Sequence, residues 1–567
     1  MSHDVIVSVQ SLHIDFQQEG ETHTAVKGVS FDIRAGETLA LVGESGSGKS
    51  VTALSLVRLI PTPPVHYPNG KITYVQKNGK SVDVLLMSDQ QMQSIRGKEI
   101  ACIFQEPMSA LNPLMTCGKQ VIEMIRQHEP IDYNAAREKA LRLFNEVKLP
   151  MAESMLDRYP HELSGGQKQR VMIAMAIACE PRLLIADEPT TALDVSMQGV
   201  IIDLLKELQA KYKMAILFIS HDLNVVSSLA HHIAVMYKGE LVEQGPCAAI
   251  LNNPQHPYTK GLLACRPNIK VRVNHLATLS DFLDPNKQTK EVEPISRSNF
   301  NHRIESLATS KPLLELHNVS IIYNQRNSWF GKKTAGVQAV NRVSLMLHEG
   351  STLGLLGESG SGKTSIGKAL VLLNKTSEGT MLYKGQDIQA LRGDALQQYR
   401  REVQMIFQDP YAALNPRMRI GGAIEEPMHV HGLQAPKQRY EKVIELLELV
   451  GLSADHYKRY PHEFSGGQRQ RITIARALAL EPKLLVCDES VSALDVSVQA
   501  QVLNLLLDLR EQFKLTYLFI SHDVAVVKHI SDFIAVMQRG KVVEYNDAES
   551  LFATPQDAFT KELLGAG

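Results

Sequence analysis

The chain has 567 residues, of which 44% are hydrophobic and 21% are charged, and its 60 Lys and Arg nearly balance its 61 Asp and Glu. Because domains of about 150 residues are common, this length predicts several domains rather than one. The net charge of −1 shows no basic excess of the kind that proteins binding nucleic-acid phosphates usually carry. Composition therefore indicates an ordinary globular, multidomain protein without a nucleic-acid partner.

The cysteines show neither a disulfide nor a metal-binding spacing, since no two of them form a C-x-x-C pair. They are Cys102, Cys117, Cys179, Cys247, Cys265 and Cys487. We expect buried thiols in a reducing compartment. The first ten residues lack a signal-peptide pattern, and apolar runs such as 171–179 are shorter than the eighteen or so residues that span a bilayer. The chain is therefore expected to be cytoplasmic and not to cross a membrane itself.

The sequence contains a long internal repeat. GETLALVGESGSGKS (36–50) returns as GSTLGLLGESGSGKT (350–364), and RYPHELSGGQKQR (158–170) returns as RYPHEFSGGQRQR (459–471). From SGGQ to the end, matching positions lie 301 residues apart, whereas Lys363 follows Lys49 by 314. The extra residues of the first half lie around 61–86, where two N-G dipeptides indicate strands and turns.

The repeat predicts two domains, 1–270 and 313–567, joined by a linker over 271–312. The linker is polar, lacks periodicity and contains prolines, so we expect it to be partly disordered or to lie over a surface. In each half, strands lead into a glycine-rich loop, an amphipathic helix follows (134–149 and 436–452), and apolar strands and helices complete the domain. This order predicts an α/β fold with a mostly parallel sheet.

Each half has one phosphate-binding loop of the form G-x-x-x-x-G-K-[ST], directly after an apolar strand. Its glycines let successive backbone N–H groups curve around phosphates, its lysine adds a positive charge, and its last hydroxyl offers a ligand to Mg²⁺. The residues expected to bind the nucleotide are Gly43, Glu44, Ser45, Gly46, Ser47, Gly48, Lys49, Ser50 and Val51, and Gly357, Glu358, Ser359, Gly360, Ser361, Gly362, Lys363, Thr364 and Ser365.

A buried strand in each half ends in an Asp-Glu pair, in LLIADE (183–188) and LLVCDE (484–489). The strand end is expected to place Asp187 or Asp488 beside the Mg²⁺ ion. The following Glu188 or Glu489 can then polarise the water that attacks the terminal phosphate.

These motifs resemble those of the ATP-binding-cassette (ABC) ATPases. LSGGQ (163–167) and FSGGQ (464–468) look like the signature loop of that family, and the phosphate-binding loops, Asp-Glu pairs, TALD or SALD segments and FISHD segments follow its order. The resemblance covers nearly the whole chain apart from the linker. It implies two tandem P-loop ABC ATPase domains, each with a RecA-like core, an antiparallel β subdomain and a helical subdomain, which bind and hydrolyse ATP with Mg²⁺.

The resemblance also implies that the two cassettes close head to tail, so that each ATP lies between one phosphate-binding loop and the opposite signature. The signature residues facing the nucleotides are then Ser164, Gly165, Gly166, Gln167, Ser465, Gly466, Gly467 and Gln468. A helix that starts at S-G-G presents N–H groups and a positive dipole end to a γ-phosphate. The implied Mg²⁺ ligands are Ser50, Gln105, Asp187, Thr364, Gln408 and Asp488.

Further roles follow from the same resemblance. Gln105 and Gln408 sense Mg²⁺ or water, His221 and His522 contact the γ-phosphate, and Asp194 and Asp495 connect the two sites. The aromatic residues expected to stack on adenine are Phe16 and Tyr323. The second half has DES where the first has DEP, but both pairs keep Asp and Glu, so we expect two competent hydrolytic sites.

NNPQHPYTKGLL (252–263) resembles the tail of ABC subunits in the dipeptide, oligopeptide and nickel importer group, and ATPQDAFTKELL (553–564) is its weaker copy. The whole pattern is similar to the fused two-cassette glutathione or peptide importers of that group. It implies a motor on the cytoplasmic face of the inner membrane, docked on two transmembrane permease subunits and served by an extracytoplasmic solute-binding protein. Only Cys265 lies near the tail, so no iron–sulfur cluster is expected.

Three alternatives stay open. A ribosome-associated translation factor also fuses two cassettes, but it would need a long, charged, helical linker. A DNA-repair ATPase would need a long coiled coil between loop and signature, or zinc-binding C-x-x-C pairs, and the sequence has neither. An importer of nickel or another small solute is the third, because the sequence does not reveal the solute.

Overall fold

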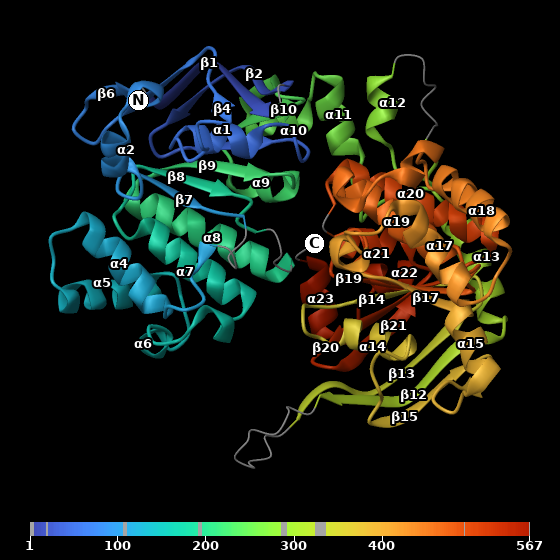
Figure 1. Ribbon diagram of the computed structural model, residues 1–567. Coiled ribbons are helices and arrows are strands. Elements are labelled where there is room, and N and C mark those ends of the chain that lie inside the picture. Colours follow the sequence, from blue (N-terminus) through green and yellow to red (C-terminus); the bar gives the residue numbers. More distant parts are fainter. Residues whose placement is uncertain are drawn as a thin grey trace. The chain divides into compact units, whose positions relative to one another are not determined.

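The computed structural model describes residues 5–18, 21–105, 110–190, 195–284, 292–323, 336–492 and 494–565. These residues form two compact units (Figure 1). Unit 1 comprises residues 1–193, 197–264 and 279–288, and unit 2 comprises 194–196, 265–278 and 289–567. No helix in the described ranges combines the length and the apolar character that a membrane span requires.

Unit 1 contains two sheets. The first is antiparallel, with strand order β2–β1–β5–β6 and β4 beside β1. The second has the order β11–β10–β3–β9–β8–β7 and is parallel except for β11. The strands are β1 (Val5–Gln18), β2 (Glu21–Arg34), β3 (Thr38–Val42), β4 (Val65–His66), β5 (Lys71–Val75), β6 (Ser81–Asp83), β7 (Ile100–Ile103), β8 (Leu183–Asp187), β9 (Ala215–Ser220), β10 (His232–Tyr237) and β11 (Glu240–Pro246).

The central strands of the parallel sheet are buried along their whole length because helices cover the sheet. The helices are α1 (Lys49–Ser55), α2 (Asp89–Ile95), α4 (Cys117–His128), α5 (Tyr133–Glu146), α6 (Ala152–Met155), α7 (Gly165–Ile177), α8 (Val195–Tyr212), α9 (Leu223–Leu229), α10 (Cys247–Asn252), α11 (Pro257–Ala264) and α12 (Leu279–Leu283). The predicted helix over 134–149 is confirmed as α5, and the strands and turns predicted around 61–86 are confirmed as β4, β5 and β6.

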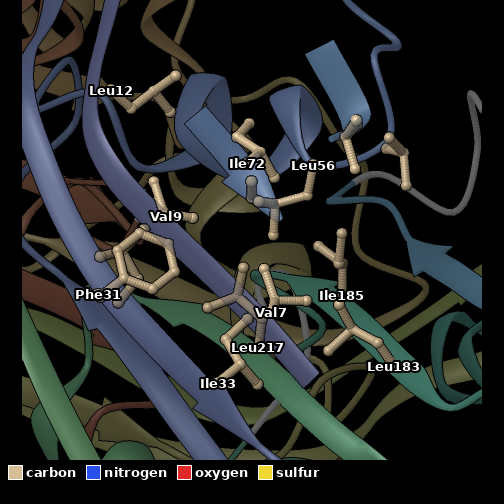
Figure 2. Packing of buried hydrophobic residues seen from close by; sticks show 14 of the residues in the cluster. Val7, Val9, Leu12, Phe31, Ile33, Leu56, Ile72, Leu183, Ile185 and Leu217 are labelled. Atoms are coloured by element: carbon tan, nitrogen blue, oxygen red, sulfur yellow. The ribbon is translucent and has the colours of Figure 1, made fainter. Parts of the chain in front are cut away.

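The core of unit 1 joins its two sheets. Val7 and Val9 of β1 and Phe31 and Ile33 of β2 pack in one cluster with Leu217 of β9 (Figure 2). Alternate residues of the long strands supply the apolar face, as the period of a strand requires. This packing fixes the parallel sheet, at whose carboxyl edge the phosphate-binding loop emerges.

Unit 2 repeats this architecture. Its antiparallel sheet has the order β13–β12–β15–β16, and its mostly parallel sheet has the order β17–β18–β19–β14–β20–β21. The strands are β12 (Pro312–Tyr323), β13 (Val337–His348), β14 (Thr352–Leu356), β15 (Glu378–Tyr383), β16 (Gln386–Asp387), β17 (Val403–Ile406), β18 (Leu484–Asp488), β19 (Thr516–Ser521), β20 (Phe533–Gln538) and β21 (Lys541–Asp547).

The helices of unit 2 largely repeat those of unit 1, with α13 added before the first strand and a 3-10 helix (Ala454–Lys458) in the place of α6. They are α13 (Arg297–Ala308), α14 (Lys363–Leu370), α15 (Gly393–Glu402), α16 (Pro410–Ala413), α17 (Ile420–Val430), α18 (Pro436–Leu449), α19 (Gly466–Leu478), α20 (Val496–Phe513), α21 (Val524–Ile530), α22 (Ala548–Ala553) and α23 (Ala558–Gly565). The helix predicted over 436–452 is confirmed as α18. Each unit therefore has the predicted α/β fold.

Parts of the segment between the repeats pack on unit 2. Arg272 is 9% exposed, and its guanidinium donates a hydrogen bond of 2.8 Å to the Ser531 carbonyl oxygen. In α13, Arg303 Nε donates to Asp532 Oδ1 at 2.8 Å. The short helix α12 instead lies beside α11 in unit 1 (Figure 1).

Candidate functional site

The phosphate-binding loop of unit 1 lies between β3 and α1, and that of unit 2 lies between β14 and α14. A Cβ atom on Gly43 would come within 2.2 Å of the Met236 carbonyl oxygen. Gly48, directly before α1, has a φ of 98°, in the left-handed region that favours glycine. The close approach and the positive φ explain why these two positions of the motif must be glycine.

The lysine of each loop is buried and held by carbonyl groups of the loop itself. Lys49 is 5% exposed, and its Nζ donates hydrogen bonds to the carbonyl oxygens of Gly43 at 2.8 Å and Glu44 at 2.7 Å. Lys363 makes the corresponding two bonds at 2.7 and 2.8 Å. A positive charge beside the N-terminus of a helix is an arrangement suited to a phosphate group.

A hydroxyl and a carboxylate meet next to each lysine. Ser50 Oγ donates to Asp187 Oδ1 at 3.0 Å, and Thr364 Oγ1 donates to Asp488 Oδ1 at 2.9 Å. Burial raises the pKa of the Asp187 carboxyl, although the Ser50 hydrogen bond opposes this, and the neighbouring Glu188 raises it further. Burial makes the negative charge of this carboxylate unfavourable unless a cation lies beside it. The carboxylate and the neighbouring hydroxyl therefore fit a Mg²⁺ ion, which prefers oxygen ligands.

The glutamate after each strand has an unusual backbone. Glu188 and Glu489 both have a φ of 45°, which costs about 1–2 kcal/mol for a non-glycine residue and is concentrated at functional sites. Glu188 Oε2 accepts a hydrogen bond from Gln105 Nε2 at 3.0 Å, and its Oε1 lies 3.1 Å from His221 Nδ1. The backbone thus turns the carboxylate toward the predicted glutamine and histidine.

The same three side chains meet in unit 2. Gln408 Nε2 donates to Glu489 Oε2 at 2.6 Å, and His522 Nδ1 lies 3.2 Å from Glu489 Oε1. Burial acts to raise the pKa of Glu489, but the hydrogen bond and charge of His522 outweigh it, so the pKa is lowered. Burial acts to lower the pKa of His522, but the hydrogen bond and the negative charge of Glu489 outweigh it, so this pKa is raised. The glutamate therefore stays ionised, as a group that polarises water must.

The signature residues begin long helices. Ser164 caps α7: its Oγ accepts from the Gln167 N–H at 3.3 Å, while Gln167 Oε1 accepts from the Ser164 N–H at 3.0 Å. Ser465 and Gln468 form the same capping box at α19. Both serines are exposed, so each helix N-terminus is accessible from solvent.

The two predicted adenine-stacking residues are placed differently. Tyr323 is 42% exposed, and its hydroxyl donates to Ser365 Oγ at 3.1 Å, directly beside the phosphate-binding loop. Phe16 is half-buried and packs against the core of unit 1. Of the residues expected to connect the sites, Asp495 directly precedes α20, and Asp194 lies outside the described residues.

A cavity of about 340 Å³ opens at the loop of unit 2. Its lining joins the loop to Gln408 and Glu489 but not to His522, the third catalytic candidate of that unit. It consists of Ala339, Ser359, Gly360, Gly362, Lys363, Thr364, Ser365, Gln408 and Glu489. The predicted site residues in this list therefore line the same cavity of unit 2. The structure brings together residues that lie up to 150 positions apart in the sequence, from Ala339 to Glu489.

Tyr258, at the start of α11 in the HPYT segment, also contacts the loop of unit 1, a role that its sequence pattern does not predict. Its side chain is fully buried, and its hydroxyl accepts a hydrogen bond of 3.0 Å from the backbone N–H of Glu44. The matching position of the second repeat is Phe559. The sequence signal for this contact is the difference between the two tail motifs, because only the first half has a hydroxyl at this position.

Comparison with known proteins agrees with this geometry. A family profile described as ABC transporter matches residues 26–191 and 340–492, which is more than half of the chain. The chain belongs to the ABC transporter family. A second profile, described as the oligopeptide/dipeptide transporter C-terminal region, matches residues 242–288. The chain is thus an ATP-hydrolysing component of an importer of the oligopeptide/dipeptide type, and both halves are ABC ATPase domains.

Several curated relatives carry the name glutathione import ATP-binding protein GsiA. That of Pectobacterium atrosepticum is 45% identical over 562 residues, and that of Escherichia coli O157:H7 is 46% identical over 572 residues. Each alignment covers 99% of this chain and 89% of the relative. Among solved structures, a dimeric bacterial ABC transporter cassette is 27% identical, with a TM-score of 0.38, and covers 41% of this chain and 98% of that cassette.

Proposed function

We propose that this ABC ATPase drives the import of glutathione or another small peptide. The observation that carries the proposal is the 45% identity to a glutathione import ATP-binding protein over 99% of the chain. The match of residues 242–288 to the oligopeptide/dipeptide region supports the same solute class. Nickel and other small solutes are then less favoured, because the relatives named here import a peptide.

In the proposed cycle, each phosphate-binding loop holds one MgATP, with Lys49 or Lys363 beside the β- and γ-phosphates. When Mg²⁺ is bound, it neutralises phosphate charge and aligns the reacting groups. Glu188 and Glu489 orient and polarise the attacking water, and the adjacent histidines contact the γ-phosphate. The hydrogen bonds from Gln105 and His221 to Glu188 support this role, since they aim the carboxylate.

We further propose that the two halves close head to tail, with each signature helix facing the nucleotide of the other half. The exposed serine caps of α7 and α19 support this arrangement, because their helix N-termini are available to an anion. The chain would work at the cytoplasmic face of the inner membrane, with two permease subunits and an extracytoplasmic solute-binding protein. ATP-driven closure and product release would then alternate the permease.

The test is a reconstitution in proteoliposomes. The chain is purified with its permeases, and ATP turnover is measured with the binding protein alone or loaded with glutathione, a dipeptide or Ni²⁺. We expect glutathione or the dipeptide to stimulate turnover only in the full complex. Stimulation by Ni²⁺ alone would exclude the peptide solute, and stimulation of the isolated chain by ribosomes would favour the translation-factor alternative.

A further inference from the structure

The two repeats end in tails that are built alike. In unit 1, Glu243 of β11 accepts hydrogen bonds from the N–H groups of Gln255 at 2.7 Å and His256 at 3.1 Å, just before α11. In unit 2, Glu544 of β21 accepts from Gln556 at 2.9 Å and from the next N–H at 3.1 Å, just before α23. The same carboxylate anchor therefore positions the first turn of both tail helices.

Within this common scaffold, one aromatic position differs. Tyr258 of α11 is fully buried and stacks on Tyr237 of β10, with ring centroids 4.2 Å apart. Phe559 of α23, at the matching position, is also buried, and Gln538 takes the place of Tyr237. The ring is thus retained in both halves, and the hydroxyl occurs in unit 1 alone.

The hydroxyl contacts the phosphate-binding loop. Tyr258 Oη accepts from the Glu44 N–H at 3.0 Å, and the carbonyl oxygen of the same residue accepts from Lys49 Nζ at 2.7 Å. Glu44 is therefore held at its N–H by the tail and at its carbonyl by the phosphate-binding lysine. Because the stack on Tyr237 fixes the ring, the hydroxyl is a rigid anchor for the start of the loop.

We infer that Tyr258 is a positioning residue that orders the phosphate-binding loop of unit 1 for nucleotide, and that unit 2 lacks this anchor. The inference rests on the proposed ATP site at Lys49. An anchored loop loses less conformational freedom when ATP binds, so the hydroxyl acts on affinity. The hydroxyl bonds to the start of the loop at Glu44, whereas the hydrolytic step depends on Glu188. The tail of the importer family therefore sets a difference between the two ATP sites.

The test uses the full chain with Lys363→Ala, which leaves the loop of unit 1 as the site under study. Equilibrium binding of the fluorescent analogue TNP-ATP is measured after adding Tyr258→Phe or, as the matched control, Tyr237→Phe. Each change removes one phenol hydroxyl from the same stack. We expect Tyr258→Phe to raise Kd about three- to tenfold, the effect of one lost hydrogen bond, and Tyr237→Phe to change it less than twofold.

A second measurement separates positioning from folding. Tyr258→Phe introduces the ring that unit 2 naturally has in Phe559, so the fold should tolerate the change. Hydrogen exchange of the loop amides, residues 43–50, should quicken in the nucleotide-free Tyr258→Phe protein and not in Tyr237→Phe. In the chain with both lysines, Tyr258→Phe should raise KM for ATP by a larger factor than it lowers kcat.

Equal Kd values and equal loop exchange in the two variants would overturn the inference. A drop in melting temperature with unchanged Kd would also overturn it, because it would show a purely structural role. Lys49→Ala in the same background tests the underlying site. If it abolishes binding while Tyr258→Phe has no effect, the inference alone is wrong. If Lys49→Ala leaves TNP-ATP binding intact, the proposed site fails and the inference with it.

Discussion

At the residue scale, the two adjacent carboxylates of the Asp-Glu pair lie in different environments. Asp187 lies against the Ser50 hydroxyl at 3.0 Å, where a cation is favoured, whereas Glu188 turns away through a φ of 45° toward Gln105 and His221. In a regular strand the side chain after Asp187 would point to the opposite face of the sheet, whereas the left-handed backbone of Glu188 directs its carboxylate to Gln105 and His221. One carboxylate can then serve the metal while the other serves water.

We therefore expect Glu188→Gln together with Glu489→Gln to leave MgATP binding nearly unchanged and to lower turnover at least ~100-fold, because an amide is a poor general base. Glutamine keeps the size of the side chain and can still accept a hydrogen bond from Gln105 or Gln408. Turnover is followed by phosphate release and binding by TNP-ATP fluorescence. Wild-type turnover in the double variant would contradict the assignment of these glutamates.

Much of this site could be predicted from the sequence because its motifs are local. The loop glycines, the lysines and the Asp-Glu pairs each depend on a strand and the turn after it. The contact between Tyr258 and Glu44 could not be predicted, because it joins residues 214 positions apart. Whether an aromatic residue packs or stays exposed, as Phe16 and Tyr323 do, also depends on the tertiary surroundings of each strand.

At the scale of elements, a buried charge cluster connects α13 to the strand before the second phosphate-binding loop. Asp532 is fully buried, and its Oδ2 accepts from the Thr352 N–H at 2.9 Å, at the start of β14. Burial acts to raise the pKa of Asp532, but Arg510 and Arg303 outweigh it, so the pKa is lowered. In unit 1 the position that matches Asp532 is His231, whose Nδ1 accepts a hydrogen bond from the Thr38 N–H at 3.0 Å.

Arg303→Met should therefore destabilise unit 2 by about 1–3 kcal/mol, because it removes a charged partner from a buried carboxylate. Hydrogen exchange of the β14 amides, residues 352–356, gives the local stability. In an Asp532→Asn background the same change should cost clearly less, since the charge that Arg303 neutralises is gone. Equal costs in both backgrounds would show that Arg303 acts by packing alone.

His529, at the end of α21, gives this region a pH dependence. Its side chain is buried, its Nε2 has no hydrogen-bond partner among the described residues, and burial and the charges of Arg272, His275 and Arg510 lower its pKa to about 3. In the unfolded chain an imidazole takes up a proton below about pH 6.5. The folded state does not take it up until about pH 3, so stability is fully present above pH 6.5 and is lost as the pH falls toward 3.

His529→Leu should therefore remove up to ~1.4 kcal/mol per pH unit from the slope of unfolding free energy against pH below about pH 6. Urea unfolding of unit 2 at a series of pH values from about 5 to 7.5 measures the slope. His302→Gln, which removes an imidazole whose side chain is 80% exposed, is the matched control. A slope that is the same in the wild type and in His529→Leu would contradict the buried, uncharged state of His529.

At the scale of the whole molecule, the repeat predicts the fold of each half but not the packing of the segment between them. The apolar strands are indicated by their hydrophobic pattern and the phosphate-binding loops by their glycine motif, and both signals are local in the sequence. The contacts of 265–278 and α13 instead depend on single polar residues, such as Arg272 and Arg303, that meet distant carbonyl and carboxylate groups. A polar segment with prolines has no periodic pattern that would reveal such contacts.

The repeat also allows the proposed head-to-tail closure to be tested within one chain. If each site takes its signature from the other half, Ser465→Arg should damage the site at Lys49, and Ser164→Arg should damage the site at Lys363. The arginine would block the helix N-terminus that meets the γ-phosphate, so closure should suffer more than initial ATP binding. In a Lys49→Ala background, adding Ser465→Arg should cost little further activity, whereas Ser164→Arg should remove what remains.

Turnover alone does not show which signature helix serves which phosphate-binding loop, because loss of one site can also lower hydrolysis at the other site through coupling. Nucleotide occupancy at each loop should therefore be measured together with turnover, by photo-crosslinking of an azido-ATP and peptide mapping. Head-to-tail closure predicts that Ser164→Arg lowers trapped nucleotide at Lys363 and leaves it at Lys49. A chain in which each signature serves its own half predicts the opposite pairing in both readouts, and that result would exclude the sandwich for this protein.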